Sequence, residues 1–324
     1  MRTFRIVLTA LIAPPAFLAV LVCATAALAA WLGRGSLRFD VLTHFAPVWF
    51  AGGLVAAVGG AFLKGFDRGA LVSLGTIAMV AAGGLIVPEL IRSTGPKAAA
   101  DAPGQIKLVQ FNVWYHNRDM ASVVAWLRKE APDVAVLEEA TPELRRLLQA
   151  EPGWHVSGGR SEVVIISKAQ PVSSFGRGEF PPTVGPIGGA TFRDARGAFT
   201  VIGVHYAWPT DAADQQSQER RLAAAIRKYR GERTIVAGDF NSAPWSFSRK
   251  RWDREFGLPR RTRALFSWPA AQYNRIRWLG LFPILPIDHV YAGDGWATVS
   301  VKRGPKVGSD HYPVIVTLAP RAPS

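Results

Sequence analysis

Two short stretches of this chain place carboxylates, an amide and a histidine close together in the sequence. "VAGDFNSAP" (236–244) contains Asp239 and Asn241, and "GSDHYPVIV" (308–316) contains Asp310 and His311. Oxygen ligands are also offered by Asn112 and Glu139, and the single cysteine rules out a thiolate metal site. A hard cation such as Mg²⁺, or Mn²⁺, therefore fits these residues best.

Histidines beside carboxylates suit phosphoryl chemistry. A protonated imidazole can stabilise charge on the non-bridging phosphate oxygens, and a carboxylate can orient a water molecule. His205 and His311 are the candidates for the first task, since each lies beside an apolar strand pattern. Such a set predicts a metal-dependent hydrolase acting on a phosphate ester.

These residues need a scaffold that brings them together. From Gln105 onward, apolar repeats predict strands alternating with helices, with Asp119 and Thr141 as helix N-caps. Asn112, Glu139, His205, Asp239 and Asn241 follow predicted strands, whereas Asp288 and His311 begin them. If the second group runs antiparallel to the first, all of these side chains reach the same edge of the core.

The first hundred residues have a different character. They contain only eight Lys or Arg and three Asp or Glu, in a chain of 324 residues whose net charge is +14. Three apolar runs, 6–32, 41–63 and 70–91, each approach the ~20 residues that cross a bilayer. We expect a membrane anchor of about three transmembrane helices at 1–92, a linker at 93–104, a catalytic domain at 105–319 and a tail at 320–324.

The first apolar run has a second interpretation. Arg2 and Arg5 precede it and "ALAAW" offers a small-residue cleavage site, so it could be a signal peptide. Basic residues are balanced on the two sides of the runs. The signal-like start favours an internal amino end, which predicts that the catalytic domain is extracytoplasmic.

Six motifs resemble those of the endonuclease/exonuclease/phosphatase superfamily in order and approximate spacing. They are "LVQFNVW", "PDVAVLEEA", "VIGVHY", "VAGDFNSAP", "PIDHVY" and "GSDHYPVIV", and the resemblance covers residues 105–318. It implies a four-layer α/β sandwich, in which two central mixed β-sheets carry helices on their outer faces.

The resemblance also implies roles for the site residues. Glu139 becomes the principal Mg²⁺ ligand, with Asn112 beside it and Asp310 near the metal or its water. The superfamily usually has Gln before this glutamate, so the neighbouring Glu138 is an alternative ligand here. Asp239 and Asn241 would orient the attacking water and hold a phosphate oxygen.

The histidines receive phosphate-binding roles from the same resemblance. His205 and His311 would contact the phosphate, and Asp288 would orient and charge His311. Glu162 could support His205. His289 should face the other side of its strand, and we leave it out of the site together with His44, His116 and His155.

The segment between residues 242 and 286 interleaves basic and aromatic residues in "RKRWDREF", "RRTR" and "YNRIRWLGLF". Such a segment suits nucleic acid or an anionic membrane surface equally well. The substrate is therefore a phosphate ester, with nucleic acid and a phospholipid headgroup both open. The alternative to an enzyme is a membrane-tethered binding or scaffold protein that retains the fold without turnover.

Overall fold

The computed structural model describes residues 2–158, 162–176, 187–229, 231–270 and 282–321. It divides into two compact units. The N-terminal unit comprises Met1–Arg92 and Trp245–Lys250, and the C-terminal unit comprises Ser93–Pro244 and Arg251–Ser324. The sequence pattern had not indicated that Trp245–Lys250 would pack with the first hundred residues.

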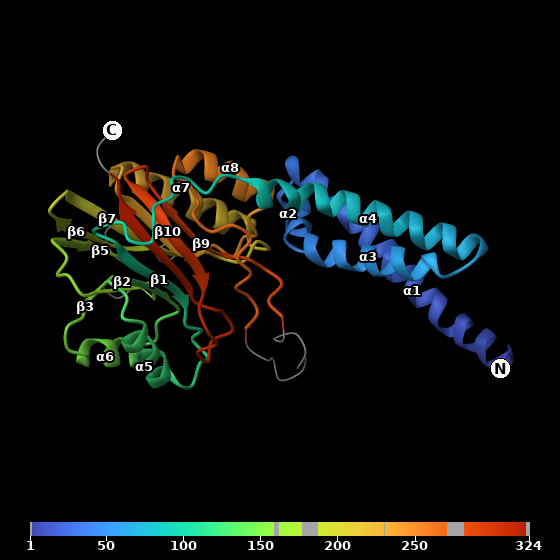
Figure 1. Cartoon of the computed structure of the whole chain (residues 1–324), viewed down its shortest axis with the longest axis horizontal. Helices are drawn as coiled ribbons and strands as arrows, with labels where there is room; N and C mark the ends of the chain where they lie inside the picture. The colour runs from blue at the N-terminus through green and yellow to red at the C-terminus, as the bar shows by residue number, and fades with distance from the viewer. Residues whose placement is uncertain (1, 159–161, 177–186, 230, 271–281, 322–324) are drawn as a thin grey trace. The chain divides into compact units, whose positions relative to one another are not determined.

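Helices make up the N-terminal unit (Figure 1). They are α1 (Arg2–Ala30), the 3₁₀ turn η1 (Trp31–Arg34), α2 (Leu37–His44), α3 (Ala46–Ala61) and α4 (Gly65–Ile91). Pro14–Arg34 and Gly65–Ile91 are long and apolar enough to cross a membrane, and α2 with α3 forms a third candidate bent by 58°. The second apolar run is thus two helices. Pro47 can begin α3 but could not continue α2, because it has no N–H to donate.

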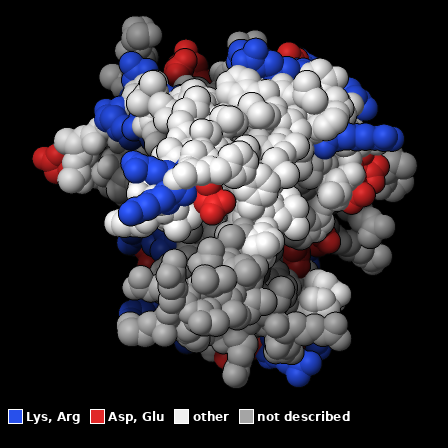
Figure 2. All heavy atoms as spheres, turned by 90° about the vertical axis from the view of Figure 1, so that its right-hand side faces the viewer, with Lys and Arg blue, Asp and Glu red and all other residues white. Residues whose placement is uncertain are grey.

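The surface of these helices also favours a membrane. Val55 and Val80 are 72% and 70% exposed, although both are aliphatic. Figure 2 shows uncharged side chains over much of the upper part of the view, with a small group of charged side chains left of the centre. Within the unit, a Cβ at Gly53 would lie 2.7 Å from Gly75 O, so only small residues permit this approach of α3 to α4.

Two mixed β-sheets form the centre of the C-terminal unit. The first has the order β10-β11-β1-β2-β4-β3 and the second has the order β5-β6-β7-β8-β9. Their strands are β1 (Ile106–Asn112), β2 (Val134–Glu138), β3 (His155–Ser157), β4 (Val164–Ser167), β5 (Ser173–Phe175), β6 (Ile187–Asp194), β7 (Gly197–His205), β8 (Thr234–Asp239), β9 (Asp288–Ala292), β10 (Trp296–Arg303) and β11 (Val314–Pro320).

Helices cover the outer face of each sheet, which confirms the predicted sandwich (Figure 1). The described helices of this unit are α5 (Met120–Glu130), α6 (Pro142–Ala150), α7 (Ala212–Lys228) and most of α8 (Phe247–Phe256). One apolar cluster joins the two sheets, a second joins the first sheet to α5 and α6, and a third joins the second sheet to α7 and α8. Asp119 and Thr141 accept the predicted N-cap hydrogen bonds from Ser122 N and Leu144 N.

Four elements were not predicted. β3 and β5 are only three residues long, which is too short for a periodic pattern to identify. In β6, the first residue Ile187 is followed by the glycines Gly188 and Gly189, which weaken the strand pattern. α8 lies in the basic segment between residues 242 and 286, where no helix was predicted because its apolar residues are separated by charged ones.

Candidate active site

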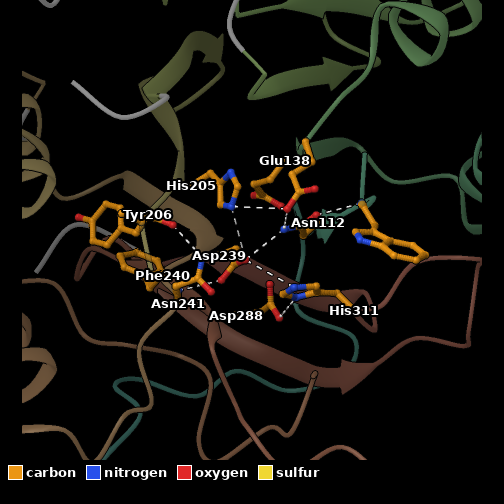
Figure 3. Close-up of polar contacts among 12 residues, drawn as sticks. Asn112, Glu138, His205, Tyr206, Asp239, Phe240, Asn241, Asp288 and His311 are labelled. Atoms are coloured by element: carbon orange, nitrogen blue, oxygen red, sulfur yellow. Dashed lines mark hydrogen bonds and ion pairs between the residues drawn. The ribbon is translucent and has the colours of Figure 1, made fainter. Parts of the chain in front are cut away.

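The inward face of each central strand ends in a polar residue. On β1, Leu108 faces the core between the sheets, and the two-residue period of a strand then points Gln110 and Asn112 the same way. β8 follows the same rule, with Ile235 and Ala237 in the core and Asp239 at the end. The apolar rows hold the two sheets together, and the polar ends form one site between them (Figure 3).

Strand direction brings the polar ends to a common edge. β7 and β8 are parallel and pair His205 with Asp239, whereas β8 and β9 are antiparallel and pair Asp239 with Asp288. β11 is antiparallel to β1, so the residues that precede it lie near Asn112. The predicted antiparallel relation is therefore confirmed, and it places His205, Asp239 and Asp288 side by side on three neighbouring strands.

Asn112 links the two sheets. Its Nδ2 donates to Glu139 Oε1 at 2.9 Å and to Asp239 Oδ2 at 3.1 Å. Its Oδ1 accepts a hydrogen bond from Trp114 N. In this arrangement the amide nitrogen faces the carboxylates, so the amide would have to turn before its oxygen could bind a cation. The role of Asn112 as a direct metal ligand stays a prediction.

Glu139 and Glu138 have separate surroundings despite being neighbours. Glu139 has a φ of +55°, which turns it out of the strand and into an open cavity. Glu138 remains on the inward face and is fully buried. Burial, followed by the charges of Asp288 and Asp239, raises the pKa of Glu138 well above its usual value. Glu139 is therefore the better placed of the two to meet a cation and substrate.

His311 lies in a buried acidic setting. Its Nδ1 donates to Asp288 Oδ2 at 2.9 Å, and its Nε2 lies 3.6 Å from Asp239 Oδ2 (Figure 3). Burial alone would lower the pKa of His311, but Asp288 and Asp239 outweigh it and raise this pKa to about 10. His311 is thus an imidazolium at neutral pH.

His205 makes a similar pair nearer to the surface. Its Nδ1 is 2.8 Å from Glu162 Oε1, and its Nε2 lies 3.7 Å from Glu139 Oε1 and 3.8 Å from Asp239 Oδ2. Burial opposes its charge, but the hydrogen bond to Glu162 and the nearby carboxylates raise the pKa of His205. The suggested support by Glu162 is present in the structure.

Asp239 is the carboxylate at the centre of the set. Burial raises its pKa to about 6, although the charges of His311 and His205 act in the opposite direction. Its Oδ1 accepts from Asn241 N at 2.8 Å, and Asn241 Nδ2 in turn donates to Tyr206 O. Asn241 has a φ of +46°, a costly conformation that these bonds maintain.

Asp310 lines the same cavity as Glu139 and accepts a hydrogen bond from Trp268 Nε1 at 3.2 Å. His289, one residue after Asp288, faces the other side of β9. There its Nε2 donates to Ser242 O at 2.8 Å, and its ring packs 5.5 Å from that of Phe240. The alternation of strand side chains thus separates His289 from the site as expected.

Two residues were missed by the sequence. Gln110 Nε2 donates to both Glu138 Oε2 and Asp288 Oδ1, so it ties a carboxyl of one sheet to a carboxylate of the other. Ser309 Oγ donates to Asn112 O and accepts from His311 N. The position of Gln110, two residues before Asn112 on the same strand face, is the signal that could have found it.

The site opens into a cavity of about 500 Å³. Its described lining combines the acids and histidines above with four aromatic residues, Trp114, Tyr115, Tyr206 and Trp208. Trp208 is 52% exposed and contacts Trp268 edge to face, at 6.0 Å between ring centroids. The cavity therefore presents both charged and aromatic side chains.

The donor set fits a hard cation. Glu139 and Asp239 place two carboxylates around one amide group, and Asp310 lines the same cavity, so oxygen donors of the kind that Mg²⁺ prefers are gathered there. Asp239, Asp288 and His311 also have atoms within 4.8 Å of one another. In that second cluster, His311 already shares a hydrogen bond with Asp288 Oδ2.

The basic segment does not match its predicted role in every part. Arg249, Arg260 and Arg261 are buried, so a substrate-binding surface was wrong for these three. Arg260 pairs with Asp253, and Arg261 donates to the carbonyls of Thr94, Ala292, Gly293 and Trp296. Arg251, Arg254 and Arg263 are exposed, and for them the prediction stands. Most of "YNRIRWLGLF" lies outside the described residues.

Comparison with known proteins gives the class of this site. Residues 109–311 match the model of the Endonuclease/Exonuclease/phosphatase family. The chain therefore belongs to this family, as the six motifs indicated. A search of curated proteins found no match.

Solved structures share the fold at low identity. The 3′ phosphatase NExo from Neisseria bound to a product DNA hairpin is 21% identical, with a TM-score of 0.51 over 65% of this chain and 98% of that one. The human Nocturnin catalytic domain with bound sulfate is 14% identical, with a TM-score of 0.51 over 67% and 94%. A functionally unknown conserved protein from Enterococcus faecalis is 16% identical, with a TM-score of 0.54 over 67% and 100%.

Proposed function

We propose that this protein is a membrane-anchored, Mg²⁺-dependent phosphoesterase that hydrolyses a phosphodiester or phosphomonoester by attack of water. One observation carries the proposal: Glu139, Asp239, His205 and His311 line one cavity, and the buried Asp288 holds His311 from behind. Glu139, Asp310 and a reoriented Asn112 would hold the cation. When bound, Mg²⁺, or Mn²⁺ in its place, would stabilise charge on the phosphate and acidify a bound water.

The protein's own groups supply the rest of the chemistry. Asp239, ionised above its pKa of about 6, orients the attacking water and accepts its proton. His311 carries a fixed positive charge towards the phosphate and is held by Asp288 Oδ2. His205 would contact the phosphate from the open side of the cavity. Asn241 also lines the cavity, and the hydrogen bond from its Nδ2 to Tyr206 O limits how its amide can rotate.

The test is hydrolysis by the full-length protein in detergent or lipid nanodiscs, with and without excess chelator. Single-stranded DNA, RNA, sphingomyelin and a generic phosphodiester serve as substrates. We expect turnover of at least one ester with Mg²⁺ or Mn²⁺ and none with chelator. Full turnover in excess chelator would remove the metal from the mechanism.

A non-catalytic scaffold is the second candidate. Inactivity on every ester, together with binding of one of them to the cavity, would favour it. The complete set of acids and histidines argues against this candidate, because a binding protein has no need to hold an imidazolium among buried carboxylates.

The proposal includes a location, with the C-terminal unit on the extracytoplasmic side. It rests on two or three candidate spans and on the signal-like amino end. A reporter enzyme that works only outside the cytoplasm, fused after Ser324, should be active. Activity from a cytoplasmic reporter alone would place the unit on the other side.

A further inference from the structure

The segment Trp245–Lys250 follows Asn241 closely in sequence, yet it packs within the N-terminal unit. Trp245 is fully buried, and its Nε1 donates to Thr43 O at 2.7 Å. A buried tryptophan whose N–H has found a partner is a specific anchor, since both its ring and its polar atom are satisfied. The segment is therefore an integral part of the packing of the N-terminal unit.

Asp40 completes the start of α8. Its Oδ1 accepts from Phe247 N and its Oδ2 accepts from Ser248 N, both at 2.8 Å, and Ser248 Oγ donates to the same carboxylate. Ser246 Oγ accepts from Arg249 N as the local cap. The first N–H groups of a helix need such partners and favour a negative charge. Asp40 is only 2% exposed, so α2 supplies a buried capping carboxylate to a helix two hundred residues later.

Further contacts hold the same turn from other helices. Phe247 packs edge to face on Trp31 at 6.0 Å, and the Arg34 guanidinium lies 4.8 Å from the Trp31 ring centroid and 5.6 Å from that of Phe247. Lys250 Nζ donates to Leu85 O at 3.4 Å. A Cβ at Gly33 would lie 2.8 Å from Asp40 Cα and 3.1 Å from Phe247, so this packing leaves no spare room.

Only a short connection joins the first turn of α8 to the active-site residue Asn241. Only residues 242–244 separate Asn241 from Trp245, and three residues span at most about 10 Å. Ser242 O is fixed by His289 on one side of them. Beyond Lys250, α8 belongs to the C-terminal unit, where Asp253 accepts from Tyr291 Oη at 2.6 Å. Residues 242–244 are therefore a short path along which a displacement of the first turn of α8 can reach the backbone of Asn241.

We propose that the N-terminal unit is a positioning element of the active site and not a passive tether. Asp40 and Thr43 hold the start of α8 and, through residues 242–244, the strained backbone of Asn241 and its bond to Asp239. The membrane helices thus set the geometry of the loop that carries the water-orienting carboxylate. The inference rests on the proposed function for its effect on turnover, but its effect on the loop can be measured without a substrate.

The experiment uses the full-length protein in lipid nanodiscs. Asp40→Ala removes the cap, Asp40→Glu retains the charge, and Trp245→Phe removes the indole hydrogen bond to Thr43 O together with part of the buried ring. Asp67→Ala is the matched control, because Asp67 is an exposed acid in the first turn of α4 within the same unit. Two quantities are measured: steady-state kinetics with Mg²⁺, and hydrogen–deuterium exchange of the peptide amides in residues 239–248.

Asp40→Ala should lower kcat by about 10-fold or more with a much smaller change in KM, because a small misplacement of a catalytic group slows chemistry more than binding. Amide exchange in residues 240–248 should rise in parallel, and Asp40→Glu should restore part of both. Trp245→Phe should shift both quantities in the same direction by less. Asp67→Ala should leave both as in the wild type.

Wild-type kcat and wild-type exchange in Asp40→Ala would overturn the proposal. If Asp40→Ala does not fold, Trp245→Phe decides in the same way: unchanged exchange and kcat overturn the positioning role, and changes in both support it. An inactive wild type would count against the proposed function alone, since the exchange measurement still reports whether Asp40 holds the loop.

Discussion

His311 and His205 each share a hydrogen bond with a carboxylate, but the two pairs differ in their access to water. The His311–Asp288 distance is 2.9 Å and the His205–Glu162 distance is 2.8 Å. Asp288 is completely buried, whereas the side chain of Glu162 is 48% exposed. We call His311–Asp288 the inner pair and His205–Glu162 the outer pair. Equal distances do not imply equally strong electrostatic interactions, because water screens the outer pair and leaves the inner pair unscreened.

From this difference we propose distinct tasks for the two pairs. Inside the site, Asp288 and Asp239 raise the pKa of His311 to about 10, so its charge is permanent under ordinary conditions. At the cavity, the pKa of His205 is also raised, but its partner Glu162 is open to solvent and to a substrate. A fixed buried charge suits transition-state stabilisation, and an accessible pair suits contact with an arriving phosphate.

Removing the inner pair should have the largest effect. Asp288→Asn and His311→Ala should each reduce kcat by roughly 10²- to 10⁴-fold, because each removes the buried charge or its orientation. The double variant should cost little more than the worse single one, since residues that act as a unit are not additive. Steady-state kinetics of the three variants provide the test.

The control for this prediction is His155→Ala, an exposed histidine on β3 that should leave turnover unchanged. His289 is a poor control because it holds Ser242, the residue that follows Asn241. Fully additive losses in the double variant would show that Asp288 and His311 act independently.

The pH profile should separate the inner pair from its surroundings. Activity should fall as pH drops through about 6, where Asp239 becomes protonated, and fall again as pH rises through about 10, where His311 loses its charge. Asp288→Asn removes the leading cause of the raised His311 pKa, so the alkaline limb should move to lower pH. The measurement is kcat/KM against pH for the wild type and this variant, and an unmoved alkaline limb would assign that limb to another group.

Changing the outer pair should have a smaller effect. Glu162→Gln should lower kcat/KM by about fivefold or less, since an exposed ion pair contributes at most about 1 kcal/mol. His205→Ala should cost more than Glu162→Gln, because it also removes the group that faces Glu139 and Asp239. Added salt should weaken the Glu162 effect but leave the Asp288 effect intact. Equal salt sensitivity of both would contradict the contrast between the pairs.

The smallest effect is expected at the exposed arginines of α8. Arg251→Ala and Arg254→Ala should raise KM for a polyanionic substrate by about twofold each, with little change in kcat and a smaller effect at high salt. Arg260→Ala, at a buried arginine, should instead lower the thermal midpoint because it removes the hydrogen bonds of the guanidinium to Asp253 Oδ2. A kcat effect at Arg251 as large as that at His311 would place α8 in the chemistry.

Much of the site could be predicted because strands impose a simple rule. Asn112, His205, Asp239 and Asp288 stand where an apolar two-residue repeat meets a polar residue, and the pairing of β7, β8 and β9 brings three of them into one row. The motif order identified the family before any contact was known. Short strands such as β3 were not predicted, since three residues are too few to show a two-residue repeat.

The sequence by itself identified the family and most of the polar residues that gather at the candidate site, since strand alternation and motif order are local properties of the chain. Only the tertiary structure decided how each of them is used. It turned Glu139 into the cavity while burying Glu138, it placed Gln110 between carboxyls of opposite sheets, and it buried arginines that a linear pattern read as a binding surface. It also brought the indole N–H of Trp245 into a hydrogen bond with the carbonyl of Thr43. Burial and partners depend on residues far apart in the chain, and a side chain's charge, strength and role follow from them.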